Sequence, residues 1–444
     1  MPELEFYAMH HDAYRWMPHK SVVGEHSRTN FISLPSDFYD KALGQRSMED
    51  FVDVAINAER LGFDGILHSE HHNTPIGISA QAMVTSAYLA ARTERILIAA
   101  VGPVLNAYLS PVRLAEEVAL VDMLSNGRLI LGLPMGIGAQ YHAYGLTNPA
   151  LARARYREAH ELLIRAMTEP GPFEFEGEFF HVPYVNLWPR PVQEPHPPIW
   201  IPAAGSRETL EMCARHRYTY QVVGGSREVN LRNINLFRDL CEQQGYTAGP
   251  EQVAAVALIH TAETDRQARL EAEAHLGWQM QNFLRSTFQD SFAPGHVSET
   301  SLRATALATG GYRSRDFSET TWDDMIKGNL IAGSPETVAE RVEELTSEMN
   351  AGRIILMFDH GSTPRWMIDK SMGLFAEQVM PRFRPPGGRP IWARGEDRRK
   401  YTTASECAAL ASKPRAIPAA RLADGTIVDV RTAHVPELRE PAEL

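Results

Sequence analysis

The segment FDGILHSEHH, residues 63–72, decides the fold class of this chain. It opens with apolar residues and ends on Glu70, His71 and His72. A carboxylate and two imidazoles are costly to place at the end of a buried strand, so we expect them to be used there. In a barrel of parallel strands, the carboxyl ends of the strands carry the chemistry. The segment therefore predicts a buried parallel strand that ends at a reaction site.

Seven further apolar runs alternate with helical patterns along the chain. The eight expected strands are residues 4–9, 65–68, 96–104, 129–133, 198–202, 220–223, 253–260 and 353–358. Eight βα units favour a TIM (β/α)8 barrel over an open doubly wound sheet. The absence of a G-x-G-x-x-G motif after the first strand weakens the open sheet further.

Three helix starts can be predicted from capping patterns. Ser110 and Ser334 each precede a proline, which is the order typical of a cap and a first helical residue. Ser47, with Asp50 three residues later, predicts a helix over residues 48–61.

Two stretches fall outside the eight units. Residues 275–330 form an insertion between strands 7 and 8 that is too long for a simple crossover. We expect a lid or pocket wall there, or else a helical subdomain on the surface. After residue 383 the cluster PPGGRP breaks regular structure, and the tail beyond it is poor in large apolar residues. We therefore predict a barrel over residues 1–383 and a C-terminal extension over 384–444 that wraps a partner subunit or stays loosely ordered.

Composition narrows the class of protein. The chain has 444 residues, and its 44% hydrophobic content is enough for a large core. A net charge of -11 argues against nucleic acid or an anionic membrane as a partner. The three cysteines lack metal-ligand spacing, and neither a signal-peptide pattern nor a membrane-spanning apolar run is present. We expect a cytoplasmic protein with no metal site.

Four segments, taken together, resemble the bacterial luciferase-like flavin-dependent monooxygenase superfamily in order and spacing. They are the Glu70-His71-His72 strand end, LVDMLSNGR with the following LGL (120–133), WPRPVQEPHPPIW (188–200) and AGSPETVAER (332–341). They lie within residues 1–383 and leave the tail unexplained. The resemblance implies reduced FMN at the C-terminal mouth of the barrel. Oxygen would add to it as a flavin hydroperoxide, which inserts one oxygen atom from O2 into a small organic substrate. The resemblance also implies a separate flavin reductase and a homodimer.

The resemblance assigns residues to two parts of the site. His71 matches the position whose imidazole lies close to the flavin, and His72 is a second catalytic candidate, with Glu70 orienting its neighbours. Ser206 and Thr209 match hydroxyls around the flavin phosphate, next to Gly205. A helix that begins there would offer free N–H groups to a phosphate. An ordinary helix cap by Ser206 would look the same in sequence.

Four more residues are expected to bind the cofactor. Ala100 would leave room for the isoalloxazine ring, and Asn106 could hydrogen-bond its polar edge, although an Asn at a strand end is often only a turn former. Met135 stands where several members of the family have an arginine that contacts the phosphate, which is a departure from the pattern. Tyr141 lies in a segment that lines the substrate pocket or simply joins a loop to a helix.

Three other functions remain open from the sequence. A deazaflavin-dependent dehydrogenase of the same superfamily would move hydride without oxygen, and a non-catalytic flavin carrier would do neither. A metallohydrolase could use His10, His11, Asp359 and His360, but residues 134–135, 203–204 and 224–225 supply no further ligands. Because no second nucleotide site is evident, we expect FMN to bind better than FAD.

Overall fold

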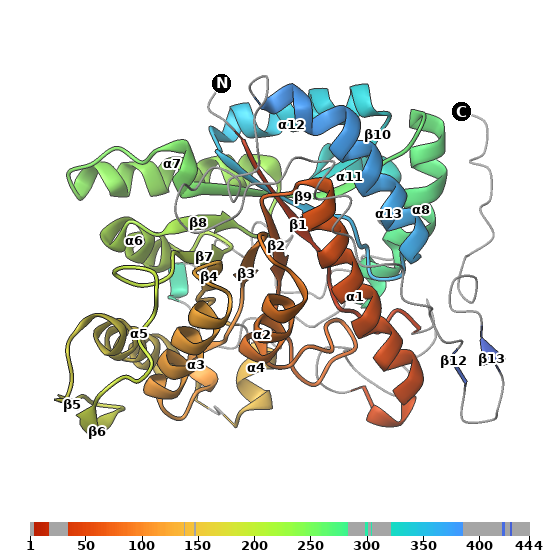
Figure 1. Cartoon of the computed structure of the whole chain (residues 1–444). Helices are drawn as coiled ribbons and strands as arrows, with labels where there is room; N and C mark the ends of the chain where they lie inside the picture. The colour runs from red at the N-terminus through yellow and green to blue at the C-terminus, as the bar shows by residue number, and fades with distance from the viewer. Residues whose placement is uncertain are drawn as a thin grey trace.

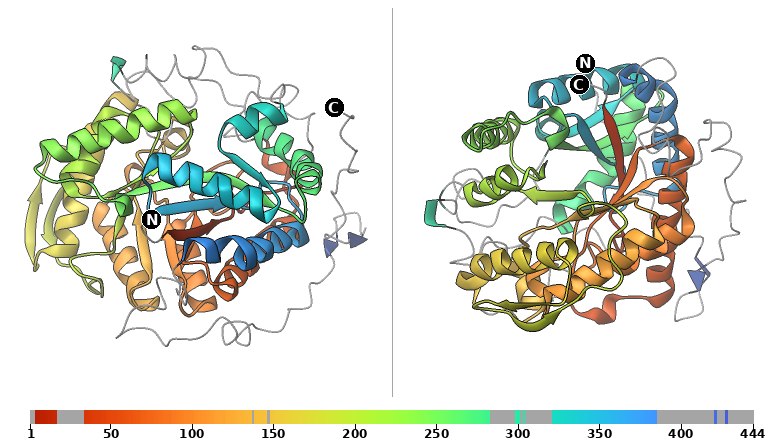
Figure 2. Two further views of the ribbon diagram at one scale, coloured as in Figure 1. Left: turned by 90° about the horizontal axis from the view of Figure 1, so that it is seen from above. Right: turned by 60° about the vertical axis from the view of Figure 1, so that its left-hand side comes forward.

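The computed structural model describes residues 4–16, 34–136, 138–145, 148–282, 298–300, 303, 321–384, 420–421 and 427–428. Eight parallel strands close into a ring, with helices around it (Figures 1 and 2). In order around the ring they are β1 (Glu5–Met9), β2 (Gly65–His68), β3 (Leu97–Ala100), β4 (Leu129–Gly132), β7 (Ile199–Ala203), β8 (Thr219–Val222), β9 (Val253–Thr261) and β11 (Arg353–Met357). Pairing of β8 with β9 and of β11 with β1 closes the ring. The predicted TIM barrel is confirmed.

Helices cover the outside of the ring, as the view along it in Figure 2 shows. They are α1 (Lys41–Leu61), α2 (Ala82–Arg92), α3 (Pro111–Leu124), α5 (Ala152–Thr168), α6 (Arg207–His216), α7 (Arg227–Gln243), α12 (Pro335–Met349) and α13 (Arg365–Leu374). A short helix α4 (Gly138–Ala143) lies at the C-terminal mouth, and the hairpin β5 (Phe173–Glu176) and β6 (His181–Val185) follows α5. No helix among the described residues has both the length and the apolar character needed to cross a membrane.

One predicted helix start is wrong. Helix α1 begins six residues before Ser47, and its N-cap is Asp40, whose side chain accepts hydrogen bonds from the backbone of Ala42 and Leu43. Ser47 lies inside the helix, where its hydroxyl donates to the carbonyl of Leu43 at 3.2 Å. The first two turns of α1 were not predicted because residues 41–50 are largely polar. Such residues can be buried there because Arg46 forms an ion pair with Asp50. The predicted starts of α3 and α12 at Pro111 and Pro335 are confirmed.

The insertion contains a ninth strand that the sequence did not predict. Strand β10 (Leu330–Gly333) pairs only with the end of β9, so it lies outside the closed ring. Helices α8 (Asp265–Asn282) and α11 (Trp322–Lys327) precede it. Most of residues 283–320 lies outside the described residues, and so does nearly all of the tail, so the predicted lid and the role of the tail stay predictions.

The carboxylate of Asp122 links two of the four segments that resemble the family, residues 120–133 and 188–200. Asp122, buried at the end of α3, accepts hydrogen bonds from the backbone of Val192 and Gln193 at 2.8 and 2.9 Å. The Gln193 amide also donates to Asp122 at 2.7 Å and to the carbonyl of Leu129 at 2.8 Å. These bonds link the loop that leads into β7 with the turn that leads into β4.

The core has two layers that follow the alternation of the strands. Side chains such as Tyr7, Trp200 and Ile355 fill the inside of the ring. Tyr7 and Trp200 meet edge to face with ring centroids 4.8 Å apart, and Arg353 lies over Trp200 while pairing with Glu5 at 2.9 Å. This plug closes the N-terminal end of the barrel. A larger cluster between the strands and the helices forms the second layer.

Arg384 contacts the barrel one residue beyond the predicted domain boundary. Its guanidinium pairs with Asp64 at 2.8 Å, and the Asp64 side chain is fully buried. The same carboxylate accepts from the backbone of Phe6 at 2.8 Å, and Arg384 also donates to the carbonyl of Gly62 at 3.1 Å. Arg384 directly follows the helical turns that continue α13, so its guanidinium holds their end against the residues that lead into β2. The boundary of the predicted C-terminal extension stays a prediction.

Replacing Arg384 with Ala should destabilise the barrel strongly. It would leave the Asp64 carboxylate buried without its cation, which costs roughly 3 kcal/mol or more of unfolding free energy. Arg382→Ala is the matched control, because the pair of Arg382 with Glu336 is exposed and should contribute less than about 1 kcal/mol. Urea unfolding measures both, and equal losses would contradict the structural role of Arg384.

Candidate active site

Glu70 organises the C-terminal mouth of the barrel beyond β2. It is 3% exposed, and its carboxylate accepts hydrogen bonds from the backbone of Ala82 at 2.8 Å and of Val104 at 3.2 Å. These partners lie at the start of α2 and beyond the end of β3. Residues 101–104 were predicted to be strand but leave the sheet after Ala100, which frees the Val104 N–H for this bond. The carboxylate thus joins the connection between β2 and α2 to the loop that follows β3.

His72 lies in a hydrogen-bonded chain that begins at Glu70. Its Nε2 lies 3.0 Å from the carboxylate, and the Tyr144 hydroxyl lies 3.0 Å from its Nδ1. The Tyr144 side chain is at the surface of the mouth, and burial together with the charge of Glu70 raises its pKa to about 12. The phenol is therefore protonated at neutral pH and can donate to His72. The chain connects a buried carboxylate with a half-exposed hydroxyl.

His71 is a neutral imidazole in this environment. Burial, together with the neighbouring His11 and His72, lowers its pKa to about 3. Its ring centroid lies 6.1 Å from that of His11. Gly77 packs against it so closely that a Cβ there would lie 2.9 Å from Cδ2 of His71. His71 can accept or donate one hydrogen bond at neutral pH, but it does not carry a charge.

Two buried aspartates that the sequence did not select as catalytic lie at the same mouth. Asp12 follows β1, and burial raises its pKa to about 7, although the Ser79 N–H donates to it. Asp359 follows β11, and burial likewise raises its pKa to about 7, with a hydrogen bond from the Gly361 N–H at 2.7 Å. The first and last strands are neighbours in a closed barrel, which is the signal that could have found this pair.

Asp12 and His71 both pack against Gly77. The Cβ that would clash with His71 at Gly77 would also lie 3.3 Å from Oδ1 of Asp12. On the other side, Asp359 lies 3.6 Å from Nε2 of His10. Among the described residues, no three His, Cys, Asp or Glu side chains gather in a way that could hold a metal ion. The acidic and imidazole groups of the mouth thus contact one another in pairs.

The second part of the site lies at the N-terminus of α6. Ser206 is the N-cap residue, but its side chain does not cap the helix; its hydroxyl lies 2.8 Å from that of Thr209. Gly205 has a φ of 95°, and a Cβ there would collide with the side chain of Asn233. The two hydroxyls thus lie together at a helix end where N–H groups favour an anion.

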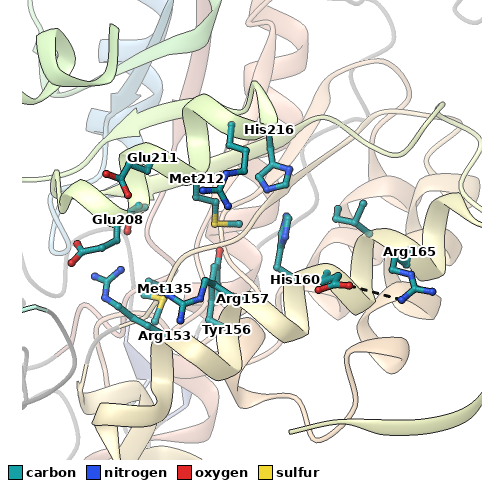
Figure 3. Close-up of a pocket in the computed structure, with 14 residues that line it drawn as sticks. Met135, Arg153, Tyr156, Arg157, His160, Arg165, Glu208, Glu211, Met212 and His216 are labelled. Carbon is teal, nitrogen blue, oxygen red and sulfur yellow. Dashed lines mark ion pairs between the residues drawn. The ribbon is translucent and has the colours of Figure 1, made fainter. Parts of the chain in front are cut away.

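Arg153 brings a cation to the same place. It comes from the first turn of α5, and its guanidinium donates to the Ser206 hydroxyl at 3.1 Å. Burial lowers its pKa, and Glu208 partly offsets this. Met135 stands at the position where several members of the family have an arginine. It lines the same cavity as Arg153 and Thr209 (Figure 3). Helix α5 thus places a cation beside the loop that follows β4.

The other predicted cofactor residues lie in different surroundings. Ala100 packs in the outer layer between strand and helix, whereas Ala99 and Val101 face the inside of the ring. Asn106 is buried and donates to the carbonyl of Ala152 at 3.0 Å. Tyr141 is also buried and donates to the carbonyl of Met135 at 2.6 Å. Asn106 and Tyr141 therefore hold the loops around Met135, and their contact with a cofactor stays a prediction.

A closed barrel with buried acids and imidazoles at the C-terminal mouth, beside a helix end that favours an anion, is an arrangement typical of TIM-barrel enzymes. The chain belongs to the luciferase-like monooxygenase family, whose model matches residues 31–349.

The comparisons with individual proteins agree with this family. The oxygenase component of the flavin-dependent trigonelline monooxygenase of Acinetobacter baylyi is 28% identical over 242 residues, which cover 52% of this chain and 64% of that relative. The oxygenating constituent of 3,6-diketocamphane monooxygenase from Pseudomonas putida, solved in complex with FMN, has a TM-score of 0.65 at 17% identity, over 87% of this chain and 100% of that one. The coenzyme F420 dependent tetrahydromethanopterin reductase of Methanopyrus kandleri has a TM-score of 0.58 at 18% identity, over 86% of this chain and 100% of that one. At these identities the solved structures show the shared fold.

Replacing Asp12 with Asn should change how stability depends on pH. The folded pKa of Asp12 is about 7 and its ordinary value is 3.8, so the unfolded chain releases this proton first as pH rises. The wild type should therefore lose stability relative to Asp12→Asn between about pH 4 and 7, by up to about 1.4 kcal/mol per pH unit. Urea unfolding of both proteins at pH 5, 6, 7 and 8 gives the difference in their unfolding free energies. A difference that stays constant across that range would refute the prediction.

Proposed function

We propose that this chain is the oxygenase component of a two-component monooxygenase that inserts one oxygen atom from O2 into a small organic substrate. The observation that carries the proposal is the pairing of the Glu70-His71-His72 strand end with the hydroxyls and cation at the start of α6, in a chain of this family. Reduced FMN, the proposed cofactor, would supply the electrons that activate O2. A separate flavin reductase would supply the reduced flavin, and we place the protein in the cytoplasm.

The phosphate of FMN would be held at the start of α6. Ser206 and Thr209 present hydroxyls that the helix does not use, and Arg153 adds a cation. A hydrogen bond to a charged group contributes about 1.5–3 kcal/mol. The three side chains together therefore fit a phosphate better than an ordinary helix cap.

The two histidines would have different tasks. His71 is neutral and buried, so it can hold a proton at one nitrogen and accept at the other while water is kept out of the mouth. His72 is held by Glu70 and Tyr144, which fixes the orientation of its ring. We propose His71 as the residue next to the reacting atoms and His72 as its neighbour with a path to the surface.

We also propose a homodimer that forms through α2 and α3. These helices lie side by side on the outside of the barrel (Figure 1), and their exposed faces carry large apolar residues. Val84 is 68% exposed and Leu124 is 57% exposed, with Tyr88, Leu120 and Met123 nearby on the same two helices. Exposed apolar residues that gather on neighbouring helices are typical of an association surface.

Ser206→Ala combined with Thr209→Ala should weaken FMN binding at least tenfold and leave riboflavin binding unchanged, because only FMN carries the phosphate. Arg153→Gln should have the same selectivity. Ser226→Ala is the control, since Ser226 caps α7 in the ordinary way. Calorimetric titration gives the affinities, and an equal loss for both flavins would show that these residues only support the helix. Tighter binding of a deazaflavin than of FMN would instead assign the chain to the dehydrogenase branch.

His71→Ala should leave folding and FMN affinity nearly intact but release hydrogen peroxide faster. The imidazole fills the mouth and holds a proton there, and an acid–base group is worth roughly two orders of magnitude in rate. Mixing protein-bound reduced FMN with O2 and following peroxide needs no knowledge of the substrate. His181→Ala, on the exposed β6 hairpin, is the control. Between pH 6 and 9 the wild-type rate should show no step from His71, because its pKa lies far below. Unchanged peroxide release would remove His71 from the mechanism.

Leu124→Asp should produce a monomer if α2 and α3 form the dimer surface, because it places a charge in the apolar contact. Tyr184→Asp, on the β6 strand away from these helices, should leave the dimer intact. Sedimentation or light scattering gives the mass, and a wild-type monomer would disprove the proposed assembly.

A further inference from the structure

Asp12, which follows β1, is a buried acid that joins two loops at the mouth of the barrel. It is 1% exposed, and its Oδ2 accepts a hydrogen bond from the Ser79 N–H. Its backbone carbonyl accepts from the Ile78 N–H at 3.0 Å. The carbonyl of Ser79 in turn accepts from the His71 N–H at 3.3 Å. Residues 78 and 79 therefore hold the loop after β1 against the loop after β2, which carries His71.

The side chains of Asp12 and His71 approach each other across Gly77. A Cβ at Gly77 would lie 3.3 Å from Oδ1 of Asp12 and 2.9 Å from Cδ2 of His71, so a larger residue would press on both. Within the described part of the chain, Oδ1 accepts no hydrogen bond from another residue. Because the Ser79 N–H fixes Oδ2 as the acceptor, the proton of a neutral carboxyl is carried by Oδ1, on the side of His71.

The imidazoles near Asp12 supply no cation at neutral pH. His10 and His11 precede it in the chain, and burial is the main cause that lowers the pKa of both, that of His11 to about 4. Burial is also the main cause that lowers the pKa of His71 to about 3. Burial raises the pKa of Asp12 itself to about 7, although hydrogen bonds from the backbone lower it. The proton on Oδ1 is therefore retained up to neutral pH and lost above it.

Asp359, after the neighbouring strand β11, is the other acid on this side of the mouth. Its carboxylate lies 3.6 Å from Nε2 of His10. Burial is the main cause of its raised pKa, to which the charges of Asp50 and Asp12 add and which the charge of Arg15 opposes. Two like charges at one site disfavour the ionisation of both acids together. Asp359 therefore contacts an imidazole of the β1 loop, whereas Asp12 is the acid beside His71.

We propose that Asp12 is a further catalytic residue, whose carboxylic acid donates a hydrogen bond from Oδ1 to the reacting group held next to His71. The inference rests on the proposed function, because it needs that group at the His71 end of the mouth. When the acid gives up its proton, its O–H bond breaks and an oxygen or nitrogen atom of the bound group gains the proton. The carboxylate then takes a proton back from water. His71 stays neutral throughout the working range, so Asp12 is the residue that makes the reaction depend on pH.

Infrared spectroscopy of the flavin-free chain tests whether Asp12 holds a proton near neutral pH. The wild type should lose a carboxylic acid C=O band between pH 6 and 8 that Asp12→Asn lacks and Asp359→Asn retains. Labelling aspartate with 13C should shift this band in the wild type, which identifies it as an aspartate without any variant. Absence of an aspartate acid band at pH 6 would overturn the proposal, because an ionised Asp12 has no proton to donate.

The pH dependence of peroxide release from protein-bound reduced FMN tests the role of that proton. Wild-type release should become about fivefold faster between pH 6 and 9, because the ionised acid no longer donates its hydrogen bond. Asp12→Asn keeps a donor at every pH and should stay at the slow rate. Asp12→Ala has no donor and should be fast at every pH. Asp359→Asn is the matched control and should keep the pH step, because Asp359 contacts His10 rather than His71.

Two results would reject the role of Asp12 alone. One is a pH step that persists in Asp12→Asn or disappears in Asp359→Asn. The other is an equal rate for Asp12→Asn and Asp12→Ala at pH 6, which would show that the hydrogen bond does not act on the reacting group. A wild type that neither binds reduced FMN nor forms peroxide would instead reject the proposed function, and this role with it.

Discussion

The geometry of the mouth depends on the buried carboxylate of Glu70. Within the part of the chain that the structure describes, its side-chain hydrogen-bond partners are the backbone N–H groups of Ala82 and Val104 and the ring of His72, which offset the cost of its burial. Each of those partners belongs to a different segment. The N-terminus of α2 also favours a negative charge. An apolar residue at this position would leave two backbone N–H groups without this acceptor and would free the ring of His72, so one side chain affects both the fold of the loops and the arrangement of the site.

Burial drives the other ionisable groups of the mouth toward their neutral forms. It lowers the pKa of His11 and His68 to about 4 and that of His71 to about 3, while it raises the pKa of Asp12 and Asp359 to about 7. Acids and bases therefore meet without full charges near neutral pH. A site of low charge and restricted water strengthens each remaining polar contact. The two carboxyl groups whose pKa is raised to about 7, those of Asp12 and Asp359, therefore change their protonation close to neutral pH.

The barrel could be predicted from the sequence because its eight strands are mostly apolar, and each of the eight predicted runs overlaps an observed strand. The errors have local causes. Strand β10 is short and borders a segment dominated by the cap pattern of α12, so it carried no separate signal. Ala100 could not be oriented because the phase of alternation in a strand buried on both faces leaves no polar side to read. Asp40 was missed as a cap because polar residues continue inside α1.

The site was harder to predict because its members are joined by three-dimensional contacts. His71 and His72 could be selected as candidates because they follow a strand end in the sequence, and their catalytic role stays a prediction. Arg153 lies far from Ser206 in the chain, and only the approach of α5 to α6 brings them together. Asp12 and Asp359 become neighbours of the histidine mouth only when the ring closes. Candidate residues that lie together in one segment can thus be predicted from the sequence. Residues that come from a distant segment can be identified only once the fold is known.

The two halves of the site are also linked to each other. The Gln140 side chain on α4 donates to the carbonyl of Glu70 at 3.2 Å, and Tyr141, the next residue, donates to the carbonyl of Met135 beside the cavity of Arg153 and Thr209. Helix α4 therefore contacts the catalytic strand end with one side chain and the loop of the phosphate end with the next. Adjacent residues of a single short helix thus link this loop to the backbone of Glu70. Binding at the start of α6 and the positioning of His72 are in this way parts of one connected structure, although the two groups come from opposite sides of β4.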